Sequence, residues 1–281
     1  MSLRVLAASP GTTIQDLGRP GLRAIGIAPS GAVDQGALRV ANRLVGNPET
    51  AAALEITLGG LRVRSDVDAW VCLAGAAVPA WIDDRPVDLW RATLLRAGRE
   101  LTLGIADHGV RVYLAVAGGI AVAPVLGSRA TDTMSGLGPD PVVAGVVLPV
   151  GPPAPPPPND VAPWTTPRGP ATVRVRRGPR LDRFAPEAWR VLTGSEWTVS
   201  AQADRVGVRL DGPQLSRADT TELPSEGMVI GALQVPPSGR PVILLADGPV
   251  TGGYPVIAVV AAADRDVLGQ LRPGDRLRLR E

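Results

Sequence analysis

The sequence predicts a mainly β protein built from two β-barrel domains and a few short helices. Two features point to this class. Short runs that alternate apolar residues with arginine recur along the 281 residues, and many of the 33 glycines and 29 prolines lie between them. A proline-rich run, residues 149–170, interrupts the chain near its middle with ten prolines. Since 45% of the residues are hydrophobic, the chain can bury one large core or two smaller ones.

The proline-rich run sets the expected domain boundaries. Proline lacks a backbone N–H and fixes φ, so neither a helix interior nor a central strand tolerates such a density. We therefore expect an N-terminal β-barrel domain at residues 1–150 and a C-terminal one at residues 171–281. Residues 151–170 are expected to form a linker of polyproline type.

Three runs give the clearest strand signal. Residues 61–64, 172–176 and 277–280 each alternate apolar side chains with arginine or threonine, which is typical of half-buried strands. Residues 97–103 and 273–279 also resemble each other, because a glycine turn leads into alternating leucines in both. This weak repeat is compatible with two related barrels, although such turns also recur by chance in β proteins.

The best helical signal lies at residues 34–45. Leu38, Ala41, Leu44 and Val45 share one face, and the sequence Gly-Asn-Pro at 46–48 ends the run. Residues 186–192 and 264–271 are weaker helix candidates.

The basic residues exclude several kinds of chemistry. All 29 are arginine, so the chain has no lysine for a Schiff base, a phosphate loop or a biotin attachment. The formal net charge is only +2 and the arginines are scattered, so we do not expect a nucleic-acid partner. A bias in nucleotide composition also explains a chain rich in arginine without lysine.

The single cysteine and the single histidine limit the sites that can form. Cys72 lies in an apolar run and is expected to be a buried thiol without a disulfide, while His108 is expected to lie in a turn. A zinc site of the usual ligands cannot be assembled from them, and no metal ligands are assigned. No run of 18 apolar residues occurs, so we expect a cytoplasmic protein without a membrane partner.

Three polar clusters in the first half are candidates for anion or substrate binding, because glycine-rich turns free backbone amides to meet a ligand. Residues 12–21 supply hydroxyls, an amide, a carboxylate and a guanidinium, but also suit a salt-bridged turn. Residues 29–34 lead into the expected helix, where simple capping by Ser30 or Asp34 is the alternative. Residues 127–132 again place hydroxyls and an arginine beside glycine. The candidate residues are Gln15, Asp16, Arg19, Ser30, Ser128, Arg129 and Asp132.

A fourth cluster combines three segments of the second half: residues 204–210, 231–236 and 247–255. The paired glycines before Tyr254 are compatible with close approach of the backbone to a ligand, but Gly-Gly-Tyr-Pro is also an acceptable turn without one. The candidates here are Arg205, Gln234, Asp247, Thr251 and Tyr254.

Six segments resemble one known family in the same order. They are TTIQDLGRPG, PSGAVDQGALRVANRLVGNPETAAALEITLGG, GSRATD, ADRVGVRLDGP, GALQVPPSGRPVILLADGPVTGGYPV and QLRPGDRL. They resemble the family of the 5-oxoprolinase C subunit, also named allophanate hydrolase subunit 2 or KipA and related to biotin-dependent carboxyltransferases. Residues 136–146 depart from the family pattern, since Pro139-Asp140-Pro141 and Gly145-Val146 replace a glycine-rich turn and a Gly-Asp pair.

The resemblance implies tandem barrels of cyclophilin-like fold and a subunit of an ATP-dependent 5-oxoprolinase. With the A and B subunits as partners, such a protein opens the cyclic amide 5-oxoproline to L-glutamate, and the isolated chain is expected to be inactive. ATP and Mg²⁺ are the implied cofactors. We expect Arg19, Arg129 and Arg205 to contact phosphate and Asp16, Asp132 and Asp247 to bind metal or transfer protons. Residues expected to orient the substrate are Gln15, Asn42, Gln234, Thr251 and Tyr254.

Two other functions stay open. The chain could be a carboxyltransferase module that moves CO₂ from biotin on a carrier to urea or a related amide. It could also be a non-enzymatic partner that controls an inhibitor of a sensor kinase.

Overall fold

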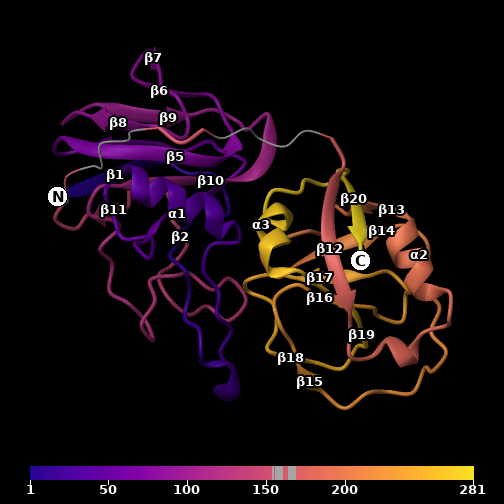
Figure 1. Ribbon diagram of the computed structural model, residues 1–281. Helices are drawn as coiled ribbons and strands as arrows, with labels where there is room; N and C mark the ends of the chain where they lie inside the picture. The colour runs from indigo at the N-terminus through magenta and orange to yellow at the C-terminus, as the bar shows by residue number, and fades with distance from the viewer. Residues whose placement is uncertain (154, 156–160, 164–168) are drawn as a thin grey trace. The chain divides into compact units, whose positions relative to one another are not determined.

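The computed structural model describes residues 1–153, 155, 161–163 and 169–281 (Figure 1). The chain divides into two compact units, Met1–Arg19 with Ser30–Thr166 and Pro20–Pro29 with Pro167–Glu281. Residues 20–29, which fall in the range expected for the first domain, thus belong to the second unit. Much of the expected linker, residues 154, 156–160 and 164–168, lies outside the described residues.

In the first unit, the strands form two sheets. One has the order β11-β1-β4-β9-β6-β7, and the other has the order β2-β3-β10-β5-β8. The strands of the first sheet are β1 (Ser2–Ala7), β4 (Arg62–Ser65), β6 (Ala80–Ile82), β7 (Arg85–Pro86), β9 (Glu100–Leu103) and β11 (Val147–Pro149). Those of the second are β2 (Thr13–Gln15), β3 (Ala53–Thr57), β5 (Ala69–Ala77), β8 (Ala92–Leu95) and β10 (His108–Val116).

Side chains from both sheets make up the main core of the first unit. Leu3 and Val63 come from one sheet and Leu114 from the other, and all three are fully buried in one cluster. Tyr113, the neighbour of Leu114 on β10, points to the opposite side, where it packs with α1 (Gln35–Leu44). Strand alternation therefore lets β10 serve two cores, one between the sheets and one beneath the helix.

In the second unit, described strands close into a barrel of seven, in the order β12-β19-β16-β17-β14-β13-β20. The strand β12 pairs with β19 in antiparallel and with β20 in parallel orientation, which completes the ring. The barrel strands are β12 (Ala171–Arg177), β13 (Glu196–Val199), β14 (Gly207–Asp211), β16 (Ala232–Gln234), β17 (Val242–Leu244), β19 (Val256–Val260) and β20 (Arg276–Arg280).

Short elements complete the second unit. Two strands, β15 (Glu226–Gly227) and β18 (Thr251–Gly252), pair outside the barrel. The helices are α2 (Ala188–Gly194), α3 (Arg265–Leu268) and the 3₁₀ turns η1 (Arg23–Ile25), η2 (Leu181–Arg183) and η3 (Ala262–Asp264). No helix in the described part of the chain is long and apolar enough to cross a membrane.

The expected fold class is confirmed as mainly β with few short helices, and the second unit is a closed barrel. The three expected half-buried strands exist: β4, β12 and β20 each alternate exposed and buried residues. The helix expected at 34–45 is α1, while the two weaker candidates form the shorter α2 and α3. The first unit differs in one respect, because its strands hydrogen-bond as two separate sheets.

Candidate functional site

The three polar clusters of the first half come together in the first unit. The loop after β2 lies against the segment before α1, since Ala32 N donates to Asp16 O at 2.9 Å. The segment at 128–132 reaches the same place, since Thr131 N donates to Ile14 O at 2.9 Å. We call this meeting point the polar junction, and its side chains are Gln15, Asp16, Arg19, Ser30, Ser128, Arg129 and Asp132.

Gly31 allows the close approach of two of these loops. Its φ is 89°, and a Cβ there would lie 2.6 Å from the backbone nitrogen of Gly18. A side chain at position 31 would therefore push the loop before α1 away from the loop after β2.

Asp16 holds the junction together. Its buried carboxylate accepts hydrogen bonds from the backbone N–H groups of Gly18 at 2.7 Å and Arg129 at 2.6 Å. It also accepts one from the Ser128 hydroxyl at 2.6 Å. These three donors, rather than a salt bridge, occupy its oxygens. Asp16 and Ser128 are thus positioned to fix the geometry of the loops.

Gln15, Arg19 and Asp132 bring unsatisfied polar atoms into the junction. Their exposed fractions are 0%, 2% and 1%. Among the described residues, no hydrogen-bond partner exists for Gln15 Oε1, for Nε and Nη1 of Arg19, or for Asp132 Oδ2. Buried polar atoms without partners are rare in folded proteins, and a catalytic role or a bound water, ion or ligand accounts for them.

Ser30 and Arg129 have identified partners. The Ser30 hydroxyl donates to the carbonyl oxygen of Thr131 at 3.1 Å, and Ser30 has a φ of 53°. Nε of Arg129, which is half-buried, donates to the carbonyl oxygen of Val122 at 2.6 Å. Both therefore tie the 128–132 segment to its surroundings.

Two other residues of the first unit have structural roles. Asn42 is fully buried on α1, donates to Ala51 O at 2.8 Å and accepts from the Asn47 amide, so it fastens the end of the helix. Asp34 accepts from Ala37 N at 2.9 Å, which is an ordinary N-cap. The capping alternative considered for residues 29–34 is thereby confirmed for Asp34.

In the second unit, Arg205 and Asp247 pair with each other. Nε and Nη2 of Arg205 donate to the two carboxylate oxygens of Asp247 at 2.8 and 3.0 Å. The exposed fractions are 7% and 0%. This bidentate ion pair ties the segment before β14 to the segment that follows β17 and neutralises both charges.

Gln234, Thr251 and Tyr254 surround the outer strand pair of the second unit. Gln234 is buried, and its amide contacts Met228 Sδ at 3.2 Å and the carbonyl of Tyr254 at 3.3 Å. A Cβ at Gly252 would lie 2.5 Å from that amide. The close backbone approach considered for the paired glycines is therefore made to the Gln234 side chain of the protein itself. Thr251 and Tyr254 have exposed side chains.

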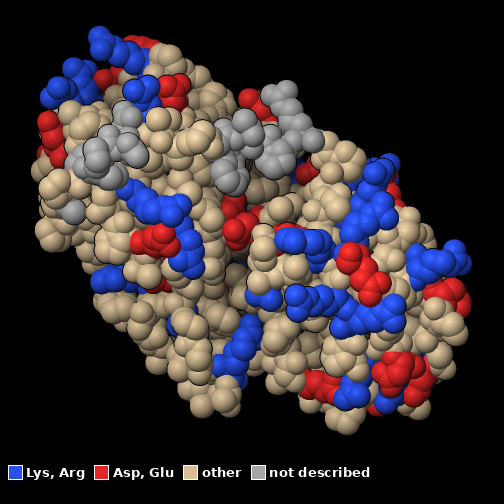
Figure 2. All heavy atoms as spheres, viewed as in Figure 1, with Lys and Arg blue, Asp and Glu red and all other residues tan. Residues whose placement is uncertain are grey.

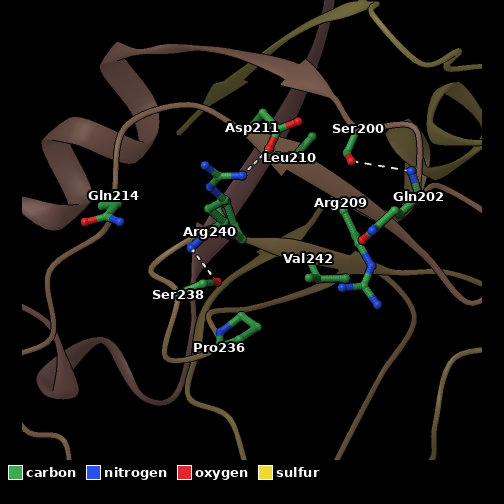
Figure 3. Close-up of a pocket in the computed structure, with 11 residues that line it drawn as sticks. Ser200, Gln202, Arg209, Leu210, Asp211, Gln214, Pro236, Ser238, Arg240 and Val242 are labelled. Carbon is green, nitrogen blue, oxygen red and sulfur yellow. Dashed lines mark hydrogen bonds and ion pairs between the residues drawn. The ribbon is translucent and has the colours of Figure 1, made fainter.

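The second unit also has a cavity of about 500 Å³, shown in Figure 3, which none of the candidate residues lines. On its rim, Arg240 Nη1 donates to Asp211 Oδ1 at 2.9 Å. The other lining residues include Arg209, Ser200, Gln202, Gln214 and Ser238. Its polar lining comes from residues on or beside β13, β14 and β17.

A buried hydrogen-bond network that was not predicted from the sequence lies beneath α1. Tyr113 Oη donates to Glu55 Oε2 at 2.7 Å, and Glu55 also accepts from Val33 N and forms an ion pair with Arg111 at 3.4 Å. Burial and the nearby Glu55 raise the pKa of Tyr113 well above its ordinary value. Since Tyr113 Oη accepts from Asp34 N, this network anchors the segment that carries Ser30. The sequence signal for this network is Glu55, a charged residue between apolar neighbours in the strand β3.

The charged side chains that the structure describes form no metal-binding cluster. Over the residues described, no group of three or more His, Cys, Asp or Glu side chains is arranged to hold a metal ion. Cys72 is buried as expected, and burial raises its pKa to about 12. His108 begins β10 instead of lying in a turn. On the face seen in Figure 2, arginines are interspersed with acidic side chains in each unit.

Comparison with known proteins assigns the chain to a family. The model of the family described as carboxyltransferase domain, subdomain A and B, matches residues 25–281. The chain belongs to the carboxyltransferase domain family. It is 41% identical to the C subunit of 5-oxoprolinase of Escherichia coli (strain K12) over 97% of this chain and 88% of that protein. The resemblance inferred from the sequence is confirmed.

Solved structures of other proteins superpose on this chain over nearly its whole length. TTHA0988 superposes with a TM-score of 0.92 at 36% identity, and all of this chain covers 55% of that one. The urea amidolyase of K. lactis superposes with a TM-score of 0.92 at 31% identity over 99% of this chain and 18% of that one. The chain thus spans about half of one relative and less than a fifth of the other.

Proposed function

We propose that the chain is a component of an ATP-dependent 5-oxoprolinase that acts in the cytoplasm with partner A and B subunits. The observation that carries this proposal is the 41% identity with the C subunit of the E. coli enzyme, which extends over 97% of this chain. The similarity includes both units, so it is not limited to one shared barrel.

The polar junction supports a site for a small polar ligand. It offers unsatisfied donors on Arg19 and unsatisfied acceptors on Gln15 and Asp132. An amide substrate has both an acceptor oxygen and a donor N–H, so it matches a site that presents both kinds of atom. Of the three aspartates expected to bind metal or transfer protons, Asp132 has a carboxylate oxygen without a partner among the described residues. Asp16 binds three donors and Asp247 pairs with Arg205.

The phosphate contacts expected from the family fit only in part. Arg205 is neutralised by Asp247, while Arg19 and Arg129 lie in the polar junction. Two arginines suit one anionic group better than a triphosphate with its metal. When bound, ATP would transfer its γ-phosphoryl group to the lactam oxygen and make the lactam carbon electrophilic. One water adding to that carbon would break the ring C–N bond, and a second would release phosphate, which gives glutamate, ADP and phosphate. This chain's part would be to bind and orient the lactam.

A carboxyltransferase function is the second candidate, because the K. lactis urea amidolyase has the same fold. In that case biotin would arrive on a separate carrier, since this chain has no lysine to carry it.

The test is to purify the chain with its A and B subunits and to measure glutamate released from 5-oxoproline. We expect release that needs this chain and ATP and that avidin does not inhibit. Asp132→Asn should lower turnover by about 100-fold or more, as loss of a group that handles protons does. The same change at the exposed Asp84 serves as control and should leave turnover unchanged.

A stable complex that releases no glutamate would refute the proposal. Inhibition by avidin would favour carboxyl transfer, and equal activity of Asp132→Asn and Asp84→Asn would remove the polar junction from the active site.

A further inference from the structure

Arg19 is a buried cation that pairs with no carboxylate of the described residues. Its exposed fraction is 2%, and its Nη2 donates to the carbonyl oxygen of Ala130. In the described part of the chain, Nε and Nη1 have no hydrogen-bond partner, and no carboxylate forms an ion pair with the guanidinium. Among the described residues two more arginines are buried, Arg111 and Arg205, and each is paired with a buried carboxylate.

The unsatisfied acceptors lie around the same short segment as Arg19. Gln15 Nε2 donates to the carbonyl of Thr131 at 2.8 Å, which leaves Oε1 unsatisfied. The next residue, Asp132, accepts from Met134 N and Ser135 N through Oδ1, which leaves Oδ2 unsatisfied. Residues 130–132 are therefore surrounded by two unsatisfied donor atoms and two unsatisfied acceptor atoms.

Such an arrangement is costly for the protein alone. A buried charge lacks the solvation that water would provide, and buried polar atoms without partners lose hydrogen bonds that the unfolded chain makes to water. Side chains that only stabilise a fold would be paired, as Arg205 and Asp247 are. The unpaired set points to a partner of complementary chemistry that arrives from outside.

We propose that Arg19, Gln15 and Asp132 form a binding site for a small carboxylic acid whose carboxylate-bearing carbon is attached to an amide N–H. Nε and Nη1 of Arg19 take the carboxylate and Asp132 Oδ2 accepts the N–H, while Gln15 holds the segment 130–132 through its hydrogen bond to Thr131 O. The inference deepens the proposed function and rests on it in one respect, since 5-oxoproline is a member of this class.

The segment 133–139 covers the site. Asp132 N donates to Leu137 O at 2.8 Å and the Thr131 hydroxyl donates to Pro139 O at 2.9 Å. A Cβ at Gly138 would lie 2.1 Å from Ala130 O and 3.3 Å from Arg19 Nη2. A ligand can reach Arg19 once this segment moves outward.

The first test compares Arg19→Met with Arg111→Met by thermal unfolding of the full chain. If Arg19 is kept for a ligand, removing its unpaired charge leaves Tm unchanged or raises it. Arg111→Met leaves the buried Glu55 carboxylate without its cation and should lower Tm by about 5–10 °C. A similar fall in Tm for Arg19→Met would show a structural role and overturn the proposal.

The second test measures binding by calorimetry to the full chain assembled with its A and B subunits. The probes are 5-oxoproline, 2-pyrrolidone, which is the same lactam without the carboxylate, and N-acetylglycine, an open-chain member of the class. Arg19→Met should weaken binding of 5-oxoproline and N-acetylglycine at least about tenfold and leave 2-pyrrolidone unaffected. Asp132→Asn should weaken binding of all three.

The outcomes separate this proposal from the proposed function. If N-acetylglycine binds through Arg19 and 5-oxoproline does not, the site is established and the 5-oxoprolinase function falls. If glutamate is released from 5-oxoproline but Arg19→Met binds every probe as the parent chain does, the function stands and this site is refuted.

Discussion

Buried charged residues of this protein differ in whether a partner satisfies them. Arg205 and Asp247 pair through two hydrogen bonds, whereas Arg19 keeps two nitrogens unsatisfied at a similar depth. The same residue type therefore serves stability in one unit and is available for recognition in the other. What separates the two roles is the presence of a carboxylate, because a guanidinium has no neutral form at physiological pH.

Breaking the Arg205–Asp247 pair should destabilise the second unit strongly. Arg205→Met leaves the Asp247 carboxylate buried and without its cation, which costs about 3–5 kcal/mol of unfolding free energy. The exposed pair Arg240–Asp211 provides the control, and Arg240→Met should cost less than about 1 kcal/mol. Urea unfolding followed by tryptophan fluorescence measures both. Equal costs would mean that burial does not govern the strength of these pairs.

Cys72 should behave as a masked thiol. Burial raises its pKa to about 12, so the native chain holds almost no thiolate at about pH 8 and should react with iodoacetamide far more slowly than the urea-unfolded chain. Mass spectrometry of the labelled chain measures this rate. The chain has one cysteine, so all labelling reports on Cys72. Equal labelling rates for the two states would contradict the buried position.

The same thiol also predicts how stability depends on pH. The folded pKa of about 12 is higher than the ordinary value of 9.0, so its contribution is present below about pH 9 and is lost as pH rises towards 12. Unfolding free energies of Cys72→Ala should therefore fall less steeply between about pH 9 and 11 than those of the parent chain. Parallel slopes would refute the shift.

At the scale of elements, loops without regular structure are fastened to one another by hydrogen bonds. The segments 16–19, 30–34 and 128–139 are joined by side-chain to backbone hydrogen bonds, and glycines permit their close approach. Loops joined in this way position side chains for binding while the two sheets provide the scaffold.

Two glycines in one loop offer a matched comparison of this packing. Gly138 and Gly136 both have positive φ, 93° and 73°, but a Cβ at 138 would meet Ala130 O at 2.1 Å and one at 136 would meet nothing within 4 Å. Gly136→Ala should cost only the conformational strain of about 1 kcal/mol. Gly138→Ala should cost at least about 2 kcal/mol more, because the segment must move. Chemical denaturation decides between them, and equal costs would show that the loop yields freely.

Local patterns predicted the elements well and the pairings between elements poorly. Alternation over four or five residues was enough to predict β4, β12 and β20, and an apolar face ended by Gly-Asn-Pro predicted α1. The clusters of the polar junction were recognised by residue type, but Ser128 and Asp16 are 112 positions apart, and no local period indicates that they touch. For the same reason Arg205 and Asp247 were both expected to contact ligands, whereas they contact each other.

At the scale of the whole molecule, the two units are interleaved in sequence. Residues 20–29 belong to the second unit although the chain continues from there into the first. Within the second unit, Arg23 Nη1 donates to Met228 O at 2.6 Å, and burial together with Arg265 lowers the pKa of Arg23. A domain boundary placed only at the proline-rich run therefore omits residues 20–29 from the second unit.

A fragment of residues 169–281 should be less stable than the same unit in the intact chain. It lacks residues 20–29 and the hydrogen bond of Arg23 to Met228. We expect its urea midpoint, followed by circular dichroism, to be lower, and a synthetic peptide of residues 20–29 to raise it. An identical midpoint with no response to the peptide would show that the segment adds nothing to this unit.

The position of β20 in the barrel has a consequence for biosynthesis. This strand, residues 276–280, lies between β12 and β13 in the barrel. In the sequence, all five remaining barrel strands lie between β20 and its partner β12. During translation the barrel cannot close until β20 has left the ribosome. Until then the edge of β12 that pairs with β20 is uncovered. Pairing over such a separation is slow, and an uncovered edge is prone to aggregate. Arginines alternate along β12 and β20. Their positive charges repel the same strands of other nascent chains and so oppose edge-to-edge aggregation.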